Sequence, residues 1–305
     1  MISIVIPCYN EELIIDDFVM ELKNSLKKID EKFEIIFVDN NSQDKTVEIL
    51  KKNISDFDIK IVCLSNYFGK ESAILAGLDK ACGNAVIIMD PDLEDPPNLI
   101  SEFIENWKKG YQVVYGERKS VQTSFFKNLM RSIFYFIFKN LVDKNFLIPE
   151  NTGDFRLLDK TVYTQIISMR ERTRFLRGLV SYIGHNQIGV KFDRPLRAKG
   201  KSKSDIKFLI NYGLDALLSS TSGPAGLISK VGIVFLFIIF IIFLFIVINK
   251  MFFNPYEGFS FTILLILFLF GLNTLMIGVI GEYVTRIYNE VKKRPNYIIK
   301  NIIED

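Results

Sequence analysis

Short apolar runs alternate with helix-patterned segments through the first third of the chain. The runs that predict strands are Ile2–Ile6, Glu34–Val38, Lys60–Leu64, Ala85–Met89 and Gln112–Tyr115. The positions with helical spacing are Leu13, Phe18, Leu22, Leu26 and Ile29, followed by Ile74, Leu75, Leu78 and Ala81. This alternation is typical of β-α-β units and predicts an α/β fold with a mostly parallel sheet, in which we expect Pro7 to end the first strand.

Polar residues follow three of the predicted strands. Residues 7–11 read Pro-Cys-Tyr-Asn-Glu, residues 39–42 read Asp-Asn-Asn-Ser, and residues 90–92 read Asp-Pro-Asp. An open α/β sheet binds its ligand at the carboxyl ends of its strands, so these segments predict a binding edge. The same residue types also serve as ordinary turn and capping residues, and each segment taken alone fits that simpler role.

Two long apolar runs dominate the last third of the chain. They cover Val231–Ile248 and Phe259–Gly281, and each is close to the roughly 20 residues that cross a bilayer. Lys and Arg residues lie before the first run and after the second, whereas the connection over 249–258 holds one Lys and one Glu. Since positive residues stay inside, the runs predict a transmembrane hairpin with both termini in the cytoplasm. The alternative is a helical hairpin buried in a soluble protein.

These patterns divide the chain into four parts. We expect a cytosolic α/β domain over 1–204, a juxtamembrane amphipathic helix over 205–226, two transmembrane helices over 227–284 and a cytosolic basic tail over 285–305. Residues 123–147 mix aromatic side chains with regular cations, the composition of helices that lie in the membrane interface. A helix packed on the sheet with its cations reaching water has the same composition.

The charge is unevenly distributed over the 305 residues. Residues 1–100 hold 10 Lys and Arg against 19 Asp and Glu, whereas residues 101–210 hold 21 against 10. An acidic first third suits a cation site, and a basic middle suits phosphates or an anionic membrane surface. The apolar tail favours a lipid bilayer over nucleic acid as the partner, and the sequence has no helix-turn-helix, zinc-finger or RNP pattern.

Several classes of chemistry have too little material in this sequence. The single histidine, His185, leaves little material for an imidazole zinc site or a Ser-His-Asp triad, and the three cysteines lack C-x-x-C spacing. The turn after the first strand is not the G-x-G-x-x-G of dinucleotide enzymes. Chemistry must therefore rest on carboxylates, amides and cations. Asp90 and Asp92 offer the hard oxygen ligands that Mg²⁺ or Mn²⁺ prefers, although such a pair is weak evidence alone.

Seven segments spread over the whole chain form a more specific pattern. They are residues 4–12 (IVIPCYNEE), 38–42 (VDNNS), 68–71 (FGKE), 90–97 (DPDLEDPP), 153–157 (GDFRL), 174–178 (RFLRG) and 281–288 (GEYVTRIY). Their combination resembles the GT-A-type, family 2 polyprenyl-phosphate glycosyltransferases, which include bactoprenol glucosyltransferases and dolichol-phosphate mannosyltransferases. The chain departs from the common pattern of that group at Asn66-Tyr67, Glu94 and Ser204, positions that bear on the identity of the sugar.

The resemblance implies a GT-A catalytic domain that transfers a sugar with inversion from a nucleotide sugar, with UDP-glucose as first choice, to polyprenyl phosphate. It implies that the base and ribose are held by Pro7, Tyr9, Glu11 and Asp39. It implies that Asp90 and Asp92 hold the diphosphate and a Mg²⁺ or Mn²⁺ ion, and that Asp154 lies near the reacting centre. For the acceptor phosphate we select Arg197, Lys201 and Lys203 from a basic stretch that also fits a merely solvated loop.

Some alternatives stay open at this stage. Asp154 could be a general base, an orienting group, or a structural carboxylate at a helix start with Arg156 as its partner. A non-catalytic membrane scaffold that binds a nucleotide, or a transferase with another sugar or lipid acceptor, fits the same chain. The oligomeric state is open, and a homo-oligomer is compatible with the sequence.

Overall fold

The computed structural model describes residues 1–53, 58–119, 149, 151–169, 175–193, 195, 241 and 259–304. The chain divides into two compact units, and each is described by itself. One unit comprises Met1–Ser220 together with Pro295–Asp305, and the other comprises Thr221–Arg294. The predicted interfacial helices over 123–147 and the juxtamembrane helix over 205–226 lie outside the described residues.

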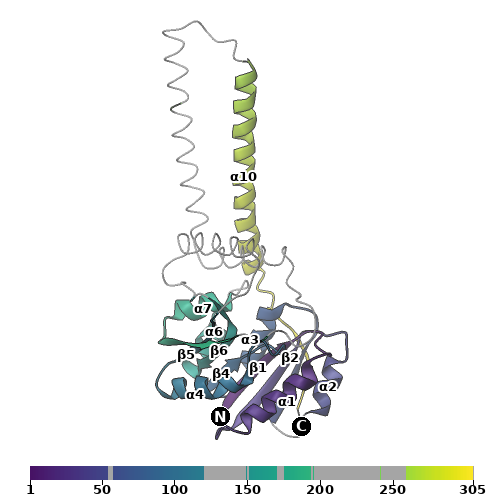
Figure 1. The fold of residues 1–305 in the computed structure, drawn as a ribbon. Coiled ribbons are helices and arrows are strands. Elements are labelled where there is room, and N and C mark those ends of the chain that lie inside the picture. Colours follow the sequence, from purple (N-terminus) through teal and green to yellow (C-terminus); the bar gives the residue numbers. More distant parts are fainter. Residues whose placement is uncertain are drawn as a thin grey trace. The chain divides into compact units, whose positions relative to one another are not determined.

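An eight-stranded sheet forms the centre of the first unit (Figure 1). Its strands are β1 (Ile2–Cys8), β2 (Phe33–Asp39), β3 (Asp58–Leu64), β4 (Ala85–Ile88), β5 (Val113–Arg118), β6 (Thr152–Asp159), β7 (Gln187–Phe192) and β8 (Ile299–Ile303). Their spatial order is β7-β5-β6-β4-β1-β2-β3-β8. Four neighbouring pairs are parallel, namely β1–β2, β1–β4, β2–β3 and β5–β7, and the other three are antiparallel. The predicted α/β fold with a mostly parallel sheet is confirmed, and all five predicted strands are present.

Helices cover both faces of the sheet. One face packs against α1 (Ile15–Leu26), α2 (Thr46–Lys52) and α4 (Ile100–Lys108), which the short helix η2 (Pro97–Leu99) precedes. The other face packs against α3 (Lys70–Lys80), α6 (Lys160–Ser168) and α7 (Leu176–Ile183). The helix predicted from Leu13 onward begins only at Ile15, and the Leu13 side chain is exposed.

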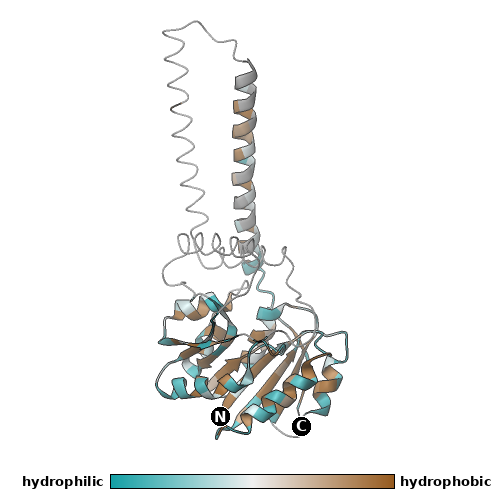
Figure 2. Cartoon of the chain, in the orientation of Figure 1, coloured by the Kyte–Doolittle hydropathy of each residue, from teal (hydrophilic) through white to brown (hydrophobic). Residues whose placement is uncertain are grey.

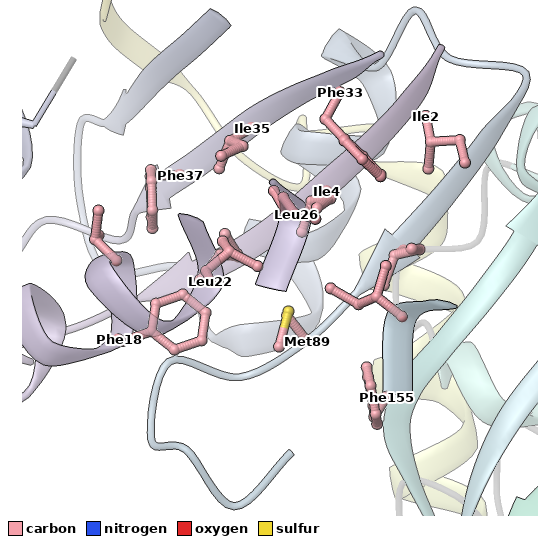
Figure 3. Packing of buried hydrophobic residues seen from close by; sticks show 14 of the residues in the cluster. Ile2, Ile4, Phe18, Leu22, Leu26, Phe33, Ile35, Phe37, Met89 and Phe155 are labelled. Carbon is pink, nitrogen blue, oxygen red and sulfur yellow. The ribbon is translucent and has the colours of Figure 1, made fainter. Parts of the chain in front are cut away.

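The burial of both faces explains the continuous apolar runs of the strands. Ile4 and Ile6 of β1 point into the cluster beneath α1, whereas Val5 between them points into the cluster beneath α3. In Figure 3, Phe18 and Leu22 of α1 lie over the sheet among such strand residues. Figure 2 shows the result as brown strands beneath helices whose outer surfaces are largely teal. A parallel sheet covered on both sides needs this composition.

Pro7 lies inside β1, so the prediction that it ends the strand is wrong. It pairs with Val38 of β2 and the strand continues to Cys8. The Val5 carbonyl accepts from Met89 on the β4 side, and alternate residues point to the same side, so the nitrogen of Pro7 also faces that side. Because β4 ends at Ile88, the missing N–H of Pro7 breaks no ladder hydrogen bond there.

A close approach between α3 and the sheet fixes the position of that helix. A Cβ atom at Gly77 would lie 2.3 Å from Val5 Cγ1 and 3.1 Å from Val38 Cγ2. Glycine therefore allows α3 to pack directly on β1 and β2. The first turn of α3 is thereby held against the carboxyl edge of the sheet, where the polar segments lie.

The end of the chain returns to the sheet, which the sequence did not predict. Within the predicted tail 285–305, β8 pairs antiparallel with β3 and forms the edge strand of the sheet next to β3. The backbone N–H of Ser65 donates to the carbonyl of Ile298 at 2.8 Å, and the hydroxyl of Tyr297 donates to Asp79 of α3 at 2.7 Å. The segment thus covers the free edge of β3.

The second unit contains α10 (Phe259–Val291). Its part Phe268–Val291 is long and apolar enough to cross a membrane, and it is the one helix of this kind among the described residues. The helix continues beyond Gly281, where the predicted apolar run ends. Apart from Ile241, the first predicted run Val231–Ile248 lies outside the described residues.

Candidate functional site

The loops that follow β1 and β2 hold each other at the carboxyl edge of the sheet. The N–H of Asn10 donates to Ser42 Oγ at 2.9 Å, and the N–H of Gln43 donates to Asn10 Oδ1 at 2.8 Å. The N–H of Glu11 donates to Thr46 Oγ1 at 2.9 Å. Asn10 has a φ of 52°, a left-handed conformation that asparagine tolerates. The predicted meeting of these two polar segments is therefore confirmed.

Asp39 ends β2 beside these loops and is buried. Its two carboxylate oxygens accept from the N–H of Ser42 at 3.3 and 3.2 Å. Burial raises the pKa of Asp39, and the hydrogen bonds from Ser42 oppose that rise. Of the predicted nucleotide residues, Pro7 lies within β1, and Asp39 is the last residue of the neighbouring β2, paired with Cys8.

An aromatic pair lies next to this loop. The rings of Tyr9 and Tyr67 are 4.5 Å apart between centroids and tilted by 49°, and the Tyr67 side chain is exposed. The N–H of Phe68 donates to Asn40 Oδ1 at 2.9 Å, which ties the segment before α3 to the loop after β2. The residues predicted for the nucleotide are thus connected to the start of α3.

Lys70 joins two of the predicted site carboxylates. As the first residue of α3, it places Nζ 2.7 Å from Asp90 Oδ2 and 2.7 Å from Asp154 Oδ2. Asp154 lies on β6, which runs antiparallel to β4 with Ile88 opposite Arg156, so Asp154 comes beside the end of β4. The structure therefore brings Asp90 and Asp154 together around one ammonium group.

Arg177 completes this group from the first turn of α7. Its Nε lies 2.7 Å from Asp154 Oδ1, and its Nη1 donates to the carbonyl of Thr152 at 3.3 Å. Burial alone would raise the pKa of Asp154, but the charges of Arg177 and Lys70 hold it well below its ordinary value. The carboxyl-edge cluster, as we call Lys70, Asp90, Asp154 and Arg177, thus keeps Asp154 ionised at neutral pH.

The structural role considered for Asp154 is not the one observed. Asp154 lies within a strand and not at a helix start. Arg156, the partner considered for it, instead donates from Nη2 to the carbonyl of Gly153 at 2.6 Å.

Glu71 links the first turn of α3 to the start of α7. Its carboxylate accepts from the backbone N–H of Leu176, the residue before Arg177. Burial raises the pKa of Glu71 to about 7, and the charge of Asp154 adds to the rise. Lys70 and Glu71 are adjacent in the first turn of α3. Lys70 therefore holds the carboxylates of Asp90 and Asp154, and Glu71 holds the start of α7, the helix that carries Arg177.

Asp95 is buried beneath the loop after β4 and binds its backbone. Its Oδ2 accepts from the N–H of Asp90 at 3.4 Å, and its Oδ1 lies 3.9 Å from Arg118 Nη2. Burial raises the pKa of Asp95 to about 7, with the charge of Asp90 as the next cause. Within the described residues, Asp95 Oδ1 and Arg118 Nε are buried without a hydrogen-bond partner.

The donor set at Asp90 and Asp92 fits a divalent cation that is shared with a phosphate ligand. Among the described residues, no group of three or more His, Cys, Asp or Glu side chains is arranged to hold a metal ion by itself. Mg²⁺ commonly uses one or two carboxylates and takes its other ligands from substrate phosphates and water. Asp92 follows Asp90 by two residues and accepts from the N–H of Glu94 at 3.1 Å, which fixes one of its oxygens.

Other predicted site residues lie outside the described part of the chain. They are Arg197, Lys201 and Lys203, selected for the acceptor phosphate. The residues that sequence reasoning did not select are Lys70, Glu71, Asp95 and Arg177. All four stand inside the segments FGKE, DPDLEDPP and RFLRG that carry the family resemblance, so the signal was present, but nothing in it showed which carboxylate each would meet.

Comparison with known proteins places these features in a family context. The sequence profile described as Glycosyl transferase family 2 matches residues 3–167. The chain is 39% identical over 301 residues to the protein of Bacillus subtilis (strain 168) named uncharacterized glycosyltransferase YkcC, covering 98% of this chain and 93% of that protein. It is 35% identical over 302 residues to the SfII prophage-derived bactoprenol glucosyl transferase of Shigella flexneri, covering 98% and 97%.

A solved structure shows a weaker likeness. The crystal structure of glucosyl-3-phosphoglycerate synthase from Mycobacterium tuberculosis in complex with phosphoglyceric acid has a TM-score of 0.48 and 17% sequence identity. The match covers 72% of this chain and 79% of that chain.

Proposed function

Because the chain belongs to glycosyl transferase family 2, we propose that it transfers glucose with inversion from UDP-glucose to the phosphate of a polyprenyl phosphate at the cytoplasmic membrane face. The observation that carries the proposal is the likeness to a bactoprenol glucosyl transferase over 98% of this chain. That likeness extends past residue 167 into the apolar region that contains α10. A lipid acceptor would explain why the chain carries such an apolar region.

The carboxyl-edge cluster supports a transfer in which the acceptor needs no general base. A phosphate monoester with a second pKa near 6 is largely dianionic at neutral pH. One of its oxygens forms the new bond to the anomeric carbon from the opposite face, and the bond from that carbon to the diphosphate breaks with its electron pair on the leaving group. Both oxygens of Asp154 are already bound to cations, so we assign it an orienting role.

In this proposal the nucleotide and the metal ion occupy neighbouring parts of the carboxyl edge of the sheet. The proposal places base and ribose at Pro7, Tyr9, Glu11 and Asp39, and a divalent cation at Asp92 with Asp90 beside it. Such a cation would supply neutralising charge for the departing diphosphate. The hard oxygen donors of the pair support this assignment.

The membrane and the acceptor form the second part of the proposal. Arg197, Lys201 and Lys203 would meet the acceptor phosphate, and the region 227–284 would hold the domain 1–204 at the bilayer surface with both termini in the cytoplasm. The apolar length of α10 supports an anchor. Anchoring a site at the height of its lipid substrate raises the effective concentration of that substrate.

Product formation tests the proposal. Membranes that contain the full-length protein are incubated with polyprenyl phosphate and a panel of labelled nucleotide sugars, and the lipid fraction is analysed. We expect a glycolipid from UDP-glucose that disappears with EDTA or with Asp92→Ala. Transfer from another donor would replace glucose as the sugar, and UDP binding without transfer from any donor would favour the scaffold alternative.

A further inference from the structure

Lys70 is the exposed member of the carboxyl-edge cluster. Its side chain is 42% exposed, against 28% for Asp90 and 6% for Asp154. Within the cluster, the Lys70 side chain is therefore the most accessible to an anion that arrives from solvent. The two carboxylates hold the ammonium in one place, so little side-chain freedom is lost when a ligand binds.

The ammonium retains capacity for a third partner. A lysine has three N–H donors, and within the described residues two of them are directed at Asp90 and Asp154. Lys70 is the first residue of α3, an 11-residue helix, so the helix dipole adds to the positive potential at this point. This arrangement suits a phosphate oxygen.

The residues around Lys70 indicate that it contacts the sugar donor, which is the nucleotide sugar, and not the lipid acceptor. Asp90 belongs to the loop after β4 that also carries Asp92. On its other side, the segment before α3 is tied through Phe68 and Asn40 to the loop that carries Asp39. Lys70 thus stands between the residues proposed for the ribose and those proposed for the diphosphate.

We propose that Lys70 is a catalytic residue that donates a hydrogen bond to the β-phosphate of the nucleoside diphosphate. This inference rests on the proposed function of the site. Lys70 binds the donor and neutralises the negative charge that the β-phosphate gains when the bond to the anomeric carbon breaks. No proton is transferred, since the electron pair of that bond stays on the diphosphate and the lysine keeps its charge.

Binding of UDP and UMP to the full-length protein tests this contact. UMP lacks the β-phosphate, so Lys70→Ala should weaken UDP binding about 10- to 100-fold and leave UMP binding within about twofold. Calorimetry in EDTA and again in Mg²⁺ separates the lysine from a cation. Lys70→Arg should restore part of the UDP affinity, and Lys52→Ala, at an exposed position of α2, should change neither ligand.

Several outcomes would overturn the assignment. Equal weakening of UDP and UMP would show that Lys70 only maintains the loops, and unchanged UDP binding would show that it makes no contact with the donor. An increase in KM for polyprenyl phosphate alone would place it on the acceptor. The proposed function fails separately, when the unchanged protein binds UDP but transfers no sugar, and the comparison of UDP with UMP still decides the role of Lys70.

Discussion

The two ends of the sheet both bury charge, but only one of them satisfies it internally. At the amino ends of the strands, the buried Glu34 carboxylate accepts from the hydroxyl of Ser3 and, at 2.6 Å, from the N–H of Cys82. Lys60 Nζ lies 3.6 Å from its other oxygen. The hydroxyl of Ser3 in turn accepts from the N–H of Gly83 at 2.8 Å. We call Ser3, Glu34, Lys60 and Cys82 the amino-edge network.

The carboxyl edge has a different character. Lys70 remains substantially exposed although it pairs with two carboxylates, and the pKa of Glu71 and of Asp95 is raised to about 7. A network that serves only the fold satisfies its polar groups internally. One that keeps an exposed cation above a group of carboxylates has capacity for a ligand. We therefore expect the amino-edge network to serve the fold and the carboxyl-edge cluster to bind a ligand.

Asp154→Asn should give the largest effect, because it removes the charge that both Lys70 and Arg177 contact. Two charge-assisted contacts are worth about 1.5–3 kcal/mol each, so kcat should fall at least about 100-fold. Asp159→Asn at the other end of β6 is the matched control, because Asp159 only caps α6 and accepts from Trp107. A loss of activity in both variants would contradict the distinction between the two edges.

The pH dependence of the parent protein sharpens the same point. The pKa of Asp154 is held well below its ordinary value of 3.8, so the group is fully ionised at every pH above this ordinary value. It contributes stability there, and this contribution is lost only as the pH falls through the lowered pKa. We therefore expect kcat to be flat between about pH 7 and 9, since the acceptor phosphate is also ionised. A tenfold rise per pH unit would instead identify a general base.

Glu34→Ala should reduce stability and leave the chemistry intact. It removes the acceptor for the Cys82 N–H at a buried position, which costs about 2–4 kcal/mol. Thermal unfolding measures the loss, and kcat of the folded fraction should be unchanged. Glu34→Gln keeps an acceptor oxygen and should cost less. A fall in kcat in the Gln variant would show that the amino-edge network also serves the site.

Glu71→Gln should change the pH dependence of stability. The pKa of Glu71 is raised from 4.5 to about 7, so stability that is full below about 4.5 is lost as the pH rises to about 7. Gln cannot ionise, so urea unfolding should show a smaller difference between pH 5 and pH 7 than in the parent. Glu48→Gln on the exposed face of α2 is the control and should leave the difference unchanged. An unchanged difference in the Glu71 variant would contradict the assignment.

Lys60→Met should give the smallest effect. Lys60 is 22% exposed and 3.6 Å from Glu34, and partly exposed pairs of this kind are worth about 1 kcal/mol or less. The neutral donors to Glu34 remain in place, so unfolding in 1 M salt and in low salt should differ little between variant and parent. A loss as large as that of Glu34→Ala would show that the ion pair, and not the hydrogen bonds, maintains the amino-edge network.

The sequence predicted β1 to β5 because these strands read as apolar runs, but it did not predict β7, which pairs parallel with β5. It did not predict β6, whose residues TGDFRLLD carry three charges, one of them, Asp154, within the site. It read the end of the chain as a basic tail because Lys292, Lys293 and Arg294 precede β8. Strands β6 and β8 owe their place to long-range antiparallel pairing, which short apolar patterns do not encode.

The site was predicted as a set of carboxylates but not as a cluster. Asp90 and Asp92 could be selected because their residue type suits the chemistry at a strand end, whereas Asp154 was implied only by the family resemblance. Their cations could not, because Lys70 meets Asp154 across 84 positions of sequence and Arg177 meets it across 23. The predictions for Arg197, Lys201 and Lys203 stay predictions.

Strand β8 limits how the chain can be threaded through a bilayer. Hydrogen-bonded pairing with β3 places the residues after α10 in the same folded unit as the residues up to Ser220. A folded sheet lies on one side of a membrane, so the chain between these two parts must cross an even number of times or not at all. If α10 crosses once, we expect a second crossing earlier in the sequence, and the apolar run Val231–Ile248 has the length for one. If the protein spans a membrane, the pairing of β3 with β8 thus requires an even number of crossings between these two strands.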